Sequence, residues 1–476
     1  MRSSSAVVDG SCALIIERAS LKHMPPEITI SPGRLPQFWD RNVLFFCNMH
    51  SIFYDNQEEV NDLISQIYGA HSYGSRVVSI LNLLFRRGPN KIFLEAPPEP
   101  NLMDYLSGDL QLSLPSFAVL DHRGYQDLVT TLKTRGSEVN PAIDGLKAHT
   151  ATWVDGFVTD RLLVEVAAGL SKRTISTFEG SKNGNNKYLL YRHQLERGLP
   201  VFETLLAANP REVPAALDRL RRLGYSKAVV KAQIGASGYG MIKLKTQNPR
   251  LDSIPDYLFF EGQCMVQGWL DEETPGVRRI GSPSIQMFLD DETVSLFDWT
   301  EQILSEASVH EGNMSPPPYI QEHPGLKDEL FRQGAIAGEW LHAQGYRGTA
   351  STDFVVIEQD GRNQVIICEI NARVTGATYP AVLARHFMPA GCWKMRNIQF
   401  RKSLDGDQLL SLIDNAQVLY RPGKDTGIIP FNLNTDDQGK VIKGQFLCLA
   451  EDHEQCSGVL AKAWTALPVE WGYDRD

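Results

Sequence analysis

The chain has 476 residues, of which 42% are hydrophobic and 22% are charged, a globular composition with enough apolar material for two or three domains. A net charge of -10 argues against a nucleic-acid-binding surface, so we expect small-molecule partners and no nucleic acid. No run reaches the roughly 18 apolar residues of a membrane span and no signal-peptide pattern opens the chain, so we expect no membrane partner. The seven scattered cysteines indicate neither a disulfide framework nor a zinc site and favour a cytoplasmic location.

The first third of the chain alternates between apolar runs and helical stretches. Runs at 42–47, 91–95 and 116–120 are typical of buried strands, and a helical pattern covers 58–69. Such alternation predicts a small α/β domain with a parallel sheet, which we place at residues 1–150.

The middle of the chain begins with a polar stretch rich in Ser, Gly and Asn. Residues 179–186 are expected to form a loop that leads into a helix at 187–197. A second predicted helix, 214–223, ends before a strand at 227–231, and a long helix is predicted at 327–344. Lys187, at the start of its helix, would be an exposed surface lysine in most proteins.

A glycine-rich segment follows the strand that ends at Lys231. Its small residues let the backbone approach a phosphate, to which Lys231 would add a positive charge; they are Gly235, Ser237, Gly238 and Gly240. The segment is neither a Walker nor a Rossmann motif, because it lacks GK[ST] and a following helix. A plain glycine-rich hairpin is the alternative.

The next strand, predicted at 263–269, could offer backbone groups to an adenine edge. The residues concerned are Gln267, Gly268, Trp269 and Leu270. An ordinary apolar core strand is the alternative interpretation. The acidic cluster 271–273 could bind ribose hydroxyls, although a solvated turn more often explains such a run.

The most informative run extends from Ile367 to Arg373. Strand alternation sends Glu369, Asn371 and Arg373 to one face. Asp353 lies in a second apolar run, and the turn at 359–363 predicts an antiparallel hairpin that joins the two runs. Carboxylate and amide oxygens suit Mg²⁺, and Arg matches phosphate oxygens. The alternative is a polar cluster satisfied by Arg373 without a metal.

The stretch from about 185 to about 387 resembles the ATP-grasp superfamily, because its elements follow the same order. That order is a lysine at a helix start, a strand lysine with a glycine-rich segment, a strand that could face adenine, and an acidic pair with an asparagine. Segments 282–286, 301–304 and 375–380 look like those of pheganomycin-type peptide ligases that carry a pre-ATP-grasp domain. That group typically reads Leu-Arg-Lys-Gly-Gly-Thr-Thr-His-Pro after the metal motif, whereas this chain reads Ala-Arg-Val-Thr-Gly-Ala-Thr-Tyr-Pro. The match to the subgroup is therefore partial.

The resemblance implies an α/β protein in which a pre-ATP-grasp domain precedes an α+β ATP-grasp fold, with the nucleotide between two subdomains. The subdomains would be 151–270 and 271–390, followed by a C-terminal extension, 391–476. The family pattern implies phosphate binding by Lys187 and Lys231, with residues 235 to 240 closing over the triphosphate.

The same pattern implies that Asp353, Glu369 and Asn371 bind two magnesium ions and that Arg373 stabilises the transferring phosphoryl group. Gln267 stands where many members have a glutamate near the adenine, so adenine recognition would rest partly on the backbone of 268–270. Lys231 and Arg373 are the expected catalytic residues.

The implied activity is an ATP- and Mg²⁺-dependent ligase of specialised metabolism. It would activate a carboxylate of an amino acid or peptide as an acyl-phosphate and join it to an amine. A ligase with a thiol or hydroxyl acceptor and a nucleotide-binding protein without turnover are the alternatives. The sequence singles out no base: His310, His323, His386 and Glu311 are candidates by residue type alone. Family habit suggests a homodimer.

Overall fold

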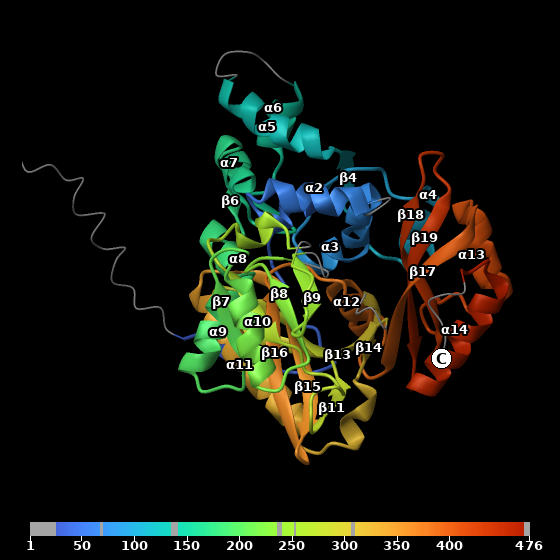
Figure 1. Ribbon diagram of the computed structural model, residues 1–476. Helices are drawn as coiled ribbons and strands as arrows, with labels where there is room; N and C mark the ends of the chain where they lie inside the picture. Colours follow the sequence, from blue (N-terminus) through green and yellow to red (C-terminus); the bar gives the residue numbers. More distant parts are fainter. Residues whose placement is uncertain are drawn as a thin grey trace, which may run out of the picture.

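The computed structural model describes residues 25–66, 70–134, 141–235, 240–251, 254–305 and 310–470. These residues form three sheets with helices around them (Figure 1). Ser237 and Gly238, two of the predicted nucleotide-binding residues, lie outside the described residues.

The N-terminal unit contains the predicted parallel sheet. Its strand order is β4-β3-β2-β5-β6, and every pairing is parallel. The strands are β2 (Val43–Phe46), β3 (Lys91–Leu94), β4 (Ser116–Val119), β5 (Trp153–Gly156) and β6 (Arg173–Thr174). Alternate residues of β2 enter two different apolar cores, as expected for a parallel sheet that is covered on both faces.

Helices and short helical turns connect these strands. They are the 3-10 turns η2 (Met49–Phe53) and η3 (Ala70–Val77), the π-helical turn η4 (Tyr105–Asp109), and the helices α2 (Gln57–Gln66), α3 (Val78–Leu84), α4 (Pro100–Asp104), α5 (His122–Thr134), α6 (Pro141–Ala148) and α7 (Arg161–Gly169). β5 and β6 lie beyond residue 150, so this sheet continues past the boundary that we expected. The division into four parts stays a prediction.

The second sheet is small and antiparallel, with the order β7-β10-β8-β9. Its strands are β7 (Thr204–Ala207), β8 (Lys227–Lys231), β9 (Met241–Lys245) and β10 (Cys264–Gly268). β8 and β9 pair as a hairpin, in which Lys231 lies opposite Met241. The glycine-rich segment therefore joins two antiparallel strands. Helices α9 (Lys187–Glu196) and α10 (Val213–Arg222) agree with the predicted positions.

The third and largest sheet carries the predicted hairpin. β15 (Gly348–Gln359) and β16 (Arg362–Asn371) pair antiparallel, and Asp353 lies opposite Glu369. The sheet also contains β11 (Val277–Gly281), β12 (Pro283–Leu289), β13 (Thr293–Leu304) and β14 (His310–Ser315). The 3-10 turn η6 (Pro318–Gln321) and helix α11 (Leu326–Ala343) connect β14 to β15, and helix α12 (Thr378–Phe387) follows β16. The 3-10 turn η5 (Asp256–Phe259) lies between β9 and β10 of the second sheet.

The segment after residue 390 extends this same sheet. β17 (Cys392–Leu404) pairs with β14, and β19 (Val441–Ala450) and β18 (Gly427–Thr435) follow, with helices α13 (Gly406–Asn415) and α14 (His453–Ala466). At the other end of the chain, β1 (Glu27–Ile30) pairs parallel with β13. The first and last strands of the described residues, β1 and β19, therefore belong to the sheet that carries the β15–β16 hairpin.

The prediction of a loop at 179–186 is wrong for most of that segment, because α8 covers Phe178–Gly184. Thr177 caps this helix by accepting a hydrogen bond from the Gly180 N–H. A Cβ at Gly180 would meet the backbone at Gly345 and Tyr346. The glycine that resembled a loop signal therefore serves close helix packing.

Candidate active site

One cavity of about 240 Å³ lies between the small sheet and the β15–β16 hairpin. Ten predicted site residues line it: Lys187, Lys231, Gly235, Gly240, Gln267, Gly268, Trp269, Leu270, Asp353 and Glu369. Asn371 and Arg373 are not among the lining residues. Four elements that are distant in sequence therefore converge on one cavity.

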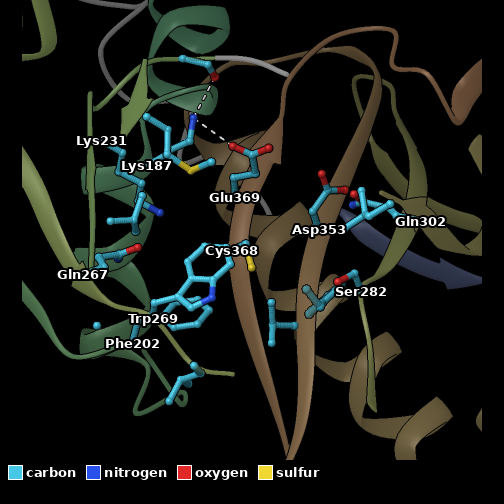
Figure 2. A pocket seen from close by; sticks show the side chains of 18 of the residues that line it. Lys187, Phe202, Lys231, Gln267, Trp269, Ser282, Gln302, Asp353, Cys368 and Glu369 are labelled. Atoms are coloured by element: carbon cyan, nitrogen blue, oxygen red, sulfur yellow. Dashed lines mark hydrogen bonds and ion pairs between the residues drawn. The ribbon is translucent and has the colours of Figure 1, made fainter. Parts of the chain in front are cut away.

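Two lysines form the cationic side of the cavity. Lys187 begins α9, whose cap residue Asn186 accepts hydrogen bonds from two backbone N–H groups of the first turn. The Lys187 ammonium lies 2.8 Å from the Gly235 carbonyl and 2.9 Å from the Glu369 carboxylate (Figure 2). Lys231 is buried, with 8% of its surface exposed, and burial together with the Lys187 charge lowers its pKa to about 8.

Two carboxylates face each other on the opposite wall, on adjacent strands. Asp353 accepts hydrogen bonds from Ser284 Oγ at 2.6 Å and from Asn371 Nδ2 at 2.9 Å. Burial and the charge of Glu369 raise the pKa of Asp353 to about 6. Burial also opposes ionisation of Glu369, but Lys187, Arg373 and Lys231 outweigh it and hold its pKa below the ordinary value.

Arg373 lies behind these groups. Its Nη1 donates to Asn185 Oδ1 at 2.5 Å, and the Asn185 amide donates to the Tyr54 hydroxyl of the N-terminal unit at 3.2 Å. Among the described residues, the ion pair with Glu369 is made by Lys187 rather than by Arg373. The alternative of a polar cluster satisfied without a metal stays a prediction. Arg373 acts on the carboxylates through its charge, which favours ionisation of both.

Some hydrogen-bonding groups of the predicted adenine segment already have partners within the protein. The N–H groups of Gly268 and Trp269 already bind the Glu203 and Lys227 carbonyls, at 2.9 and 3.1 Å. Gln267 Nε2 donates to Thr204 Oγ1 at 2.8 Å. Leu270 is therefore the member of this segment that we expect to offer its backbone N–H to a base.

The acidic cluster beyond this strand has other partners. Lys227 Nζ lies 3.0 Å from Asp271 and 2.7 Å from Glu273, and neither acid lines the cavity. Of the four candidate bases, His310, His323, His386 and Glu311, none lines it either.

Half of the lining was missed as site residues. It consists of Phe202, Val229, Met241, Arg279, Ser282, Gln302, Leu304, Phe354, Val355 and Cys368. Cys368 precedes Glu369 and could have been noticed, but burial raises the pKa of its thiol to about 12, so it is not a thiolate. Arg279 Nη2 donates to Ser282 Oγ at 2.5 Å, so the cavity lining also includes a guanidinium.

Known proteins resemble this chain in sequence and in fold. No family model matches the chain. A curated relative, the butirosin acyl-carrier protein–L-glutamate ligase of Niallia circulans, is 23% identical over 347 residues, which cover 71% of this chain and 74% of the relative.

Two solved structures share the fold. The ADP complex of an N5-carboxyaminoimidazole ribonucleotide synthetase aligns with a TM-score of 0.55 at 13% identity, over 93% of this chain and 98% of that one. A biotin carboxylase–ATP-analogue complex from Campylobacter jejuni gives a TM-score of 0.56 at 12% identity, over 90% and 92%. The chain therefore has the α/β architecture of the ATP-grasp enzymes, and the predicted ATP-grasp fold is confirmed. In the described residues no helix combines the length and apolarity of a membrane span.

Proposed function

We propose that the protein is an ATP-dependent ligase that joins a carboxylate to an amine through an acyl-phosphate. The observation that carries this proposal is the convergence of Lys187 and Lys231 with Asp353 and Glu369 around one cavity. The relative's name, which is that of a ligase, supports the same reaction class. The full set of charged groups argues against a nucleotide binder without turnover.

The nucleotide would lie with its triphosphate at the lysine end and its base at the apolar end. Phe202, Trp269 and Leu270 line the apolar end, where aromatic and aliphatic surfaces suit a purine ring. Figure 2 shows Trp269 and Phe202 on this side, apart from the ion pair of Lys187 with Glu369. Gly235 and Gly240, which lie between β8 and β9 and line the cavity, would lie over the phosphates.

The acidic hairpin fits magnesium. Two carboxylates placed on opposed positions repel each other, which contributes to the raised pKa of Asp353, and a divalent cation would remove that repulsion. Asp353, Glu369 and Asn371 would hold it, and when bound it would neutralise charge on the β- and γ-phosphates.

The residues of the chain would then position the reaction rather than form a covalent bond. A bound carboxylate attacks the γ-phosphorus, ADP leaves, and the acyl-phosphate remains in the site. Lys187 and Lys231 stabilise the developing charge, and Arg373 adds positive potential from behind. The amine then attacks the acyl carbon, and inorganic phosphate and a proton leave. The β8–β9 hairpin would exclude water from the acyl-phosphate until then.

The substrates are proposed from the relative. Its name contains L-glutamate and an acyl-carrier protein, so L-glutamate is our first candidate amino acid, with a free amino acid or a carrier-bound group as the second substrate. A thiol or hydroxyl acceptor is the second candidate, because a carrier-bound acceptor need not be an amine.

The test measures ADP release from Mg-ATP with pooled amino acids and carboxylic acids, with L-glutamate and with an acyl-carrier protein, and records product masses in the same tubes. A new mass equal to two substrates less water supports the ligase. A hydroxylamine trap distinguishes a released acyl-phosphate from no activation, because hydroxylamine converts it to a hydroxamate. Neither ADP nor hydroxamate with any pool would contradict the proposal.

A further inference from the structure

A second group of polar side chains gathers in the N-terminal unit, at one edge of its parallel sheet. His50 follows β2, Glu95 directly follows β3, and His122 follows β4 and begins α5. These three strands are neighbours in the order β4-β3-β2 and all run in the same direction. Their carboxyl ends therefore meet at one edge, which is where open α/β sheets bind ligands.

The three side chains offer ligand atoms to one point. One ring nitrogen of each histidine and one Glu95 oxygen all lie within 4.8 Å of one another. His50 Nδ1 is 3.2 Å from Glu95 Oε1, and the two imidazole rings have centroids 4.8 Å apart. A cavity of about 10 Å³, lined by Glu95 and His122, adjoins them. A space of that size holds about one water molecule or one ion, and no organic substrate.

A metal-free ion pair is the simpler account of this group, and two observations speak against it. Among the described residues, His50 Nδ1 is buried and has no hydrogen-bond partner of acceptable geometry, although Glu95 is near. His122 lies against His50, with the centroids of the two imidazole rings 4.8 Å apart. An ion pair between His50 and Glu95 needs no second imidazole, whereas two imidazoles beside one carboxylate form a donor set that a metal ion uses.

We propose that His50, Glu95 and His122 bind one zinc ion. Two imidazoles and one carboxylate are a donor set that suits Zn²⁺, and three protein ligands leave a fourth position for water. Bonds of about 2.0–2.2 Å to zinc would draw the three side chains closer by rotation. The ion would tie together the ends of three adjacent strands. The seven cysteines had indicated no zinc site, and none of them belongs to this one.

This proposal is independent of the proposed ligase function. None of the three residues lines the nucleotide cavity. The ligand atoms of the two sites also differ, since the β15–β16 hairpin offers oxygen atoms alone and the second group offers two imidazole nitrogens. The two sites can therefore be tested separately in the same protein.

The experiment titrates zinc chloride into the full-length protein after removal of metals with a chelator. Excess magnesium fills the Asp353–Glu369 site, and calorimetry gives the stoichiometry. We expect one tightly bound zinc per chain in the wild type, and its loss in Glu95→Gln and in His122→Gln. His323→Gln, which removes a half-buried histidine elsewhere, and Glu369→Gln should both retain it. Cobalt(II) in place of zinc should give a visible absorption band that Glu95→Gln abolishes.

Circular dichroism of the chelated proteins shows whether each variant folds, and His122, at the start of a helix, is the second position should Glu95→Gln unfold. A wild type that binds no zinc would overturn the proposal. So would zinc binding that persists in folded Glu95→Gln and His122→Gln, or that disappears only in Glu369→Gln, because the ion would then belong to the acidic hairpin.

Discussion

Among single residues, Glu369 makes the contact that joins the two walls of the cavity, through its 2.9 Å ion pair with Lys187. Glu369→Gln keeps the shape and removes the charge. We expect kcat to fall by about 10²-fold or more, because a carboxylate ligand of the proposed magnesium ion is lost, while the protein stays folded. Steady-state ADP release measures kcat, and circular dichroism checks the fold. Glu358→Gln, which removes the half-buried partner of the exposed Arg278 on the same hairpin, is the matched control. Equal activity in both variants would contradict the site.

Lys231 gives a prediction about pH. Its pKa is lowered to about 8, so the side chain is charged below that pH and loses its proton above it. The Michaelis constant for ATP should therefore rise between about pH 7 and pH 9, by up to about tenfold, the equivalent of about 1.4 kcal/mol. Lys231→Arg keeps its charge over this range and should show no such rise. A wild-type Michaelis constant for ATP that does not change up to about pH 9 would contradict the placement of Lys231 at the phosphates.

At the scale of elements, two helical glycines should respond to alanine with opposite signs. A Cβ at Gly180 in α8 would meet the backbone at Gly345 and Tyr346, whereas one at Gly458 in α14 would meet nothing within 4 Å. Gly458→Ala should stabilise the protein by about 0.5–1 kcal/mol, from helix propensity. Gly180→Ala should destabilise it by about 1–3 kcal/mol, from overpacking. Urea unfolding measures both, and stabilisation by Gly180→Ala would show that α8 packs differently.

Helix α8 also shows where prediction from the sequence succeeds and where it fails. Period and strand composition located β8, β15, β16 and the start of α9 closely, because each is a local pattern. The α8 segment was misread because glycine signals a turn or a close approach equally well, and only the tertiary partner decides. Arg279 and Gln302 were missed for the same reason: they reach the cavity through strand pairing over long sequence separations. His50, Glu95 and His122 likewise share no local motif.

At the scale of the whole molecule, the chain is joined across its parts by one apolar core. This core contains residues of β2 and β3 from the N-terminal unit together with residues of β17, β18 and β19. The segment after residue 390 therefore supports the sheet that carries Asp353 and Glu369. It contributes no residue to the cavity, so we expect it to act on turnover through stability.

Asp298 tests that expectation, because its hydrogen bonds join three strands of the large sheet and helix α12. From β13 it accepts hydrogen bonds from Arg385 of α12 at 2.9 and 3.0 Å, from Trp393 of β17 at 3.0 Å and from Ser315 of β14 at 2.9 Å. Asp298→Asn would leave a buried guanidinium facing an amide. Removing one partner of a buried pair costs about 3–5 kcal/mol, and we expect that loss of unfolding free energy in urea.

The control for this prediction is Asp218→Asn, which removes a solvent-accessible acid paired with Arg221 and Arg222 and should leave the free energy of unfolding nearly unchanged. Turnover by the folded fraction of Asp298→Asn should stay near the wild-type value, because Asp298 lies outside the cavity. A loss of turnover without a loss of stability would show instead that the junction positions the acidic hairpin directly.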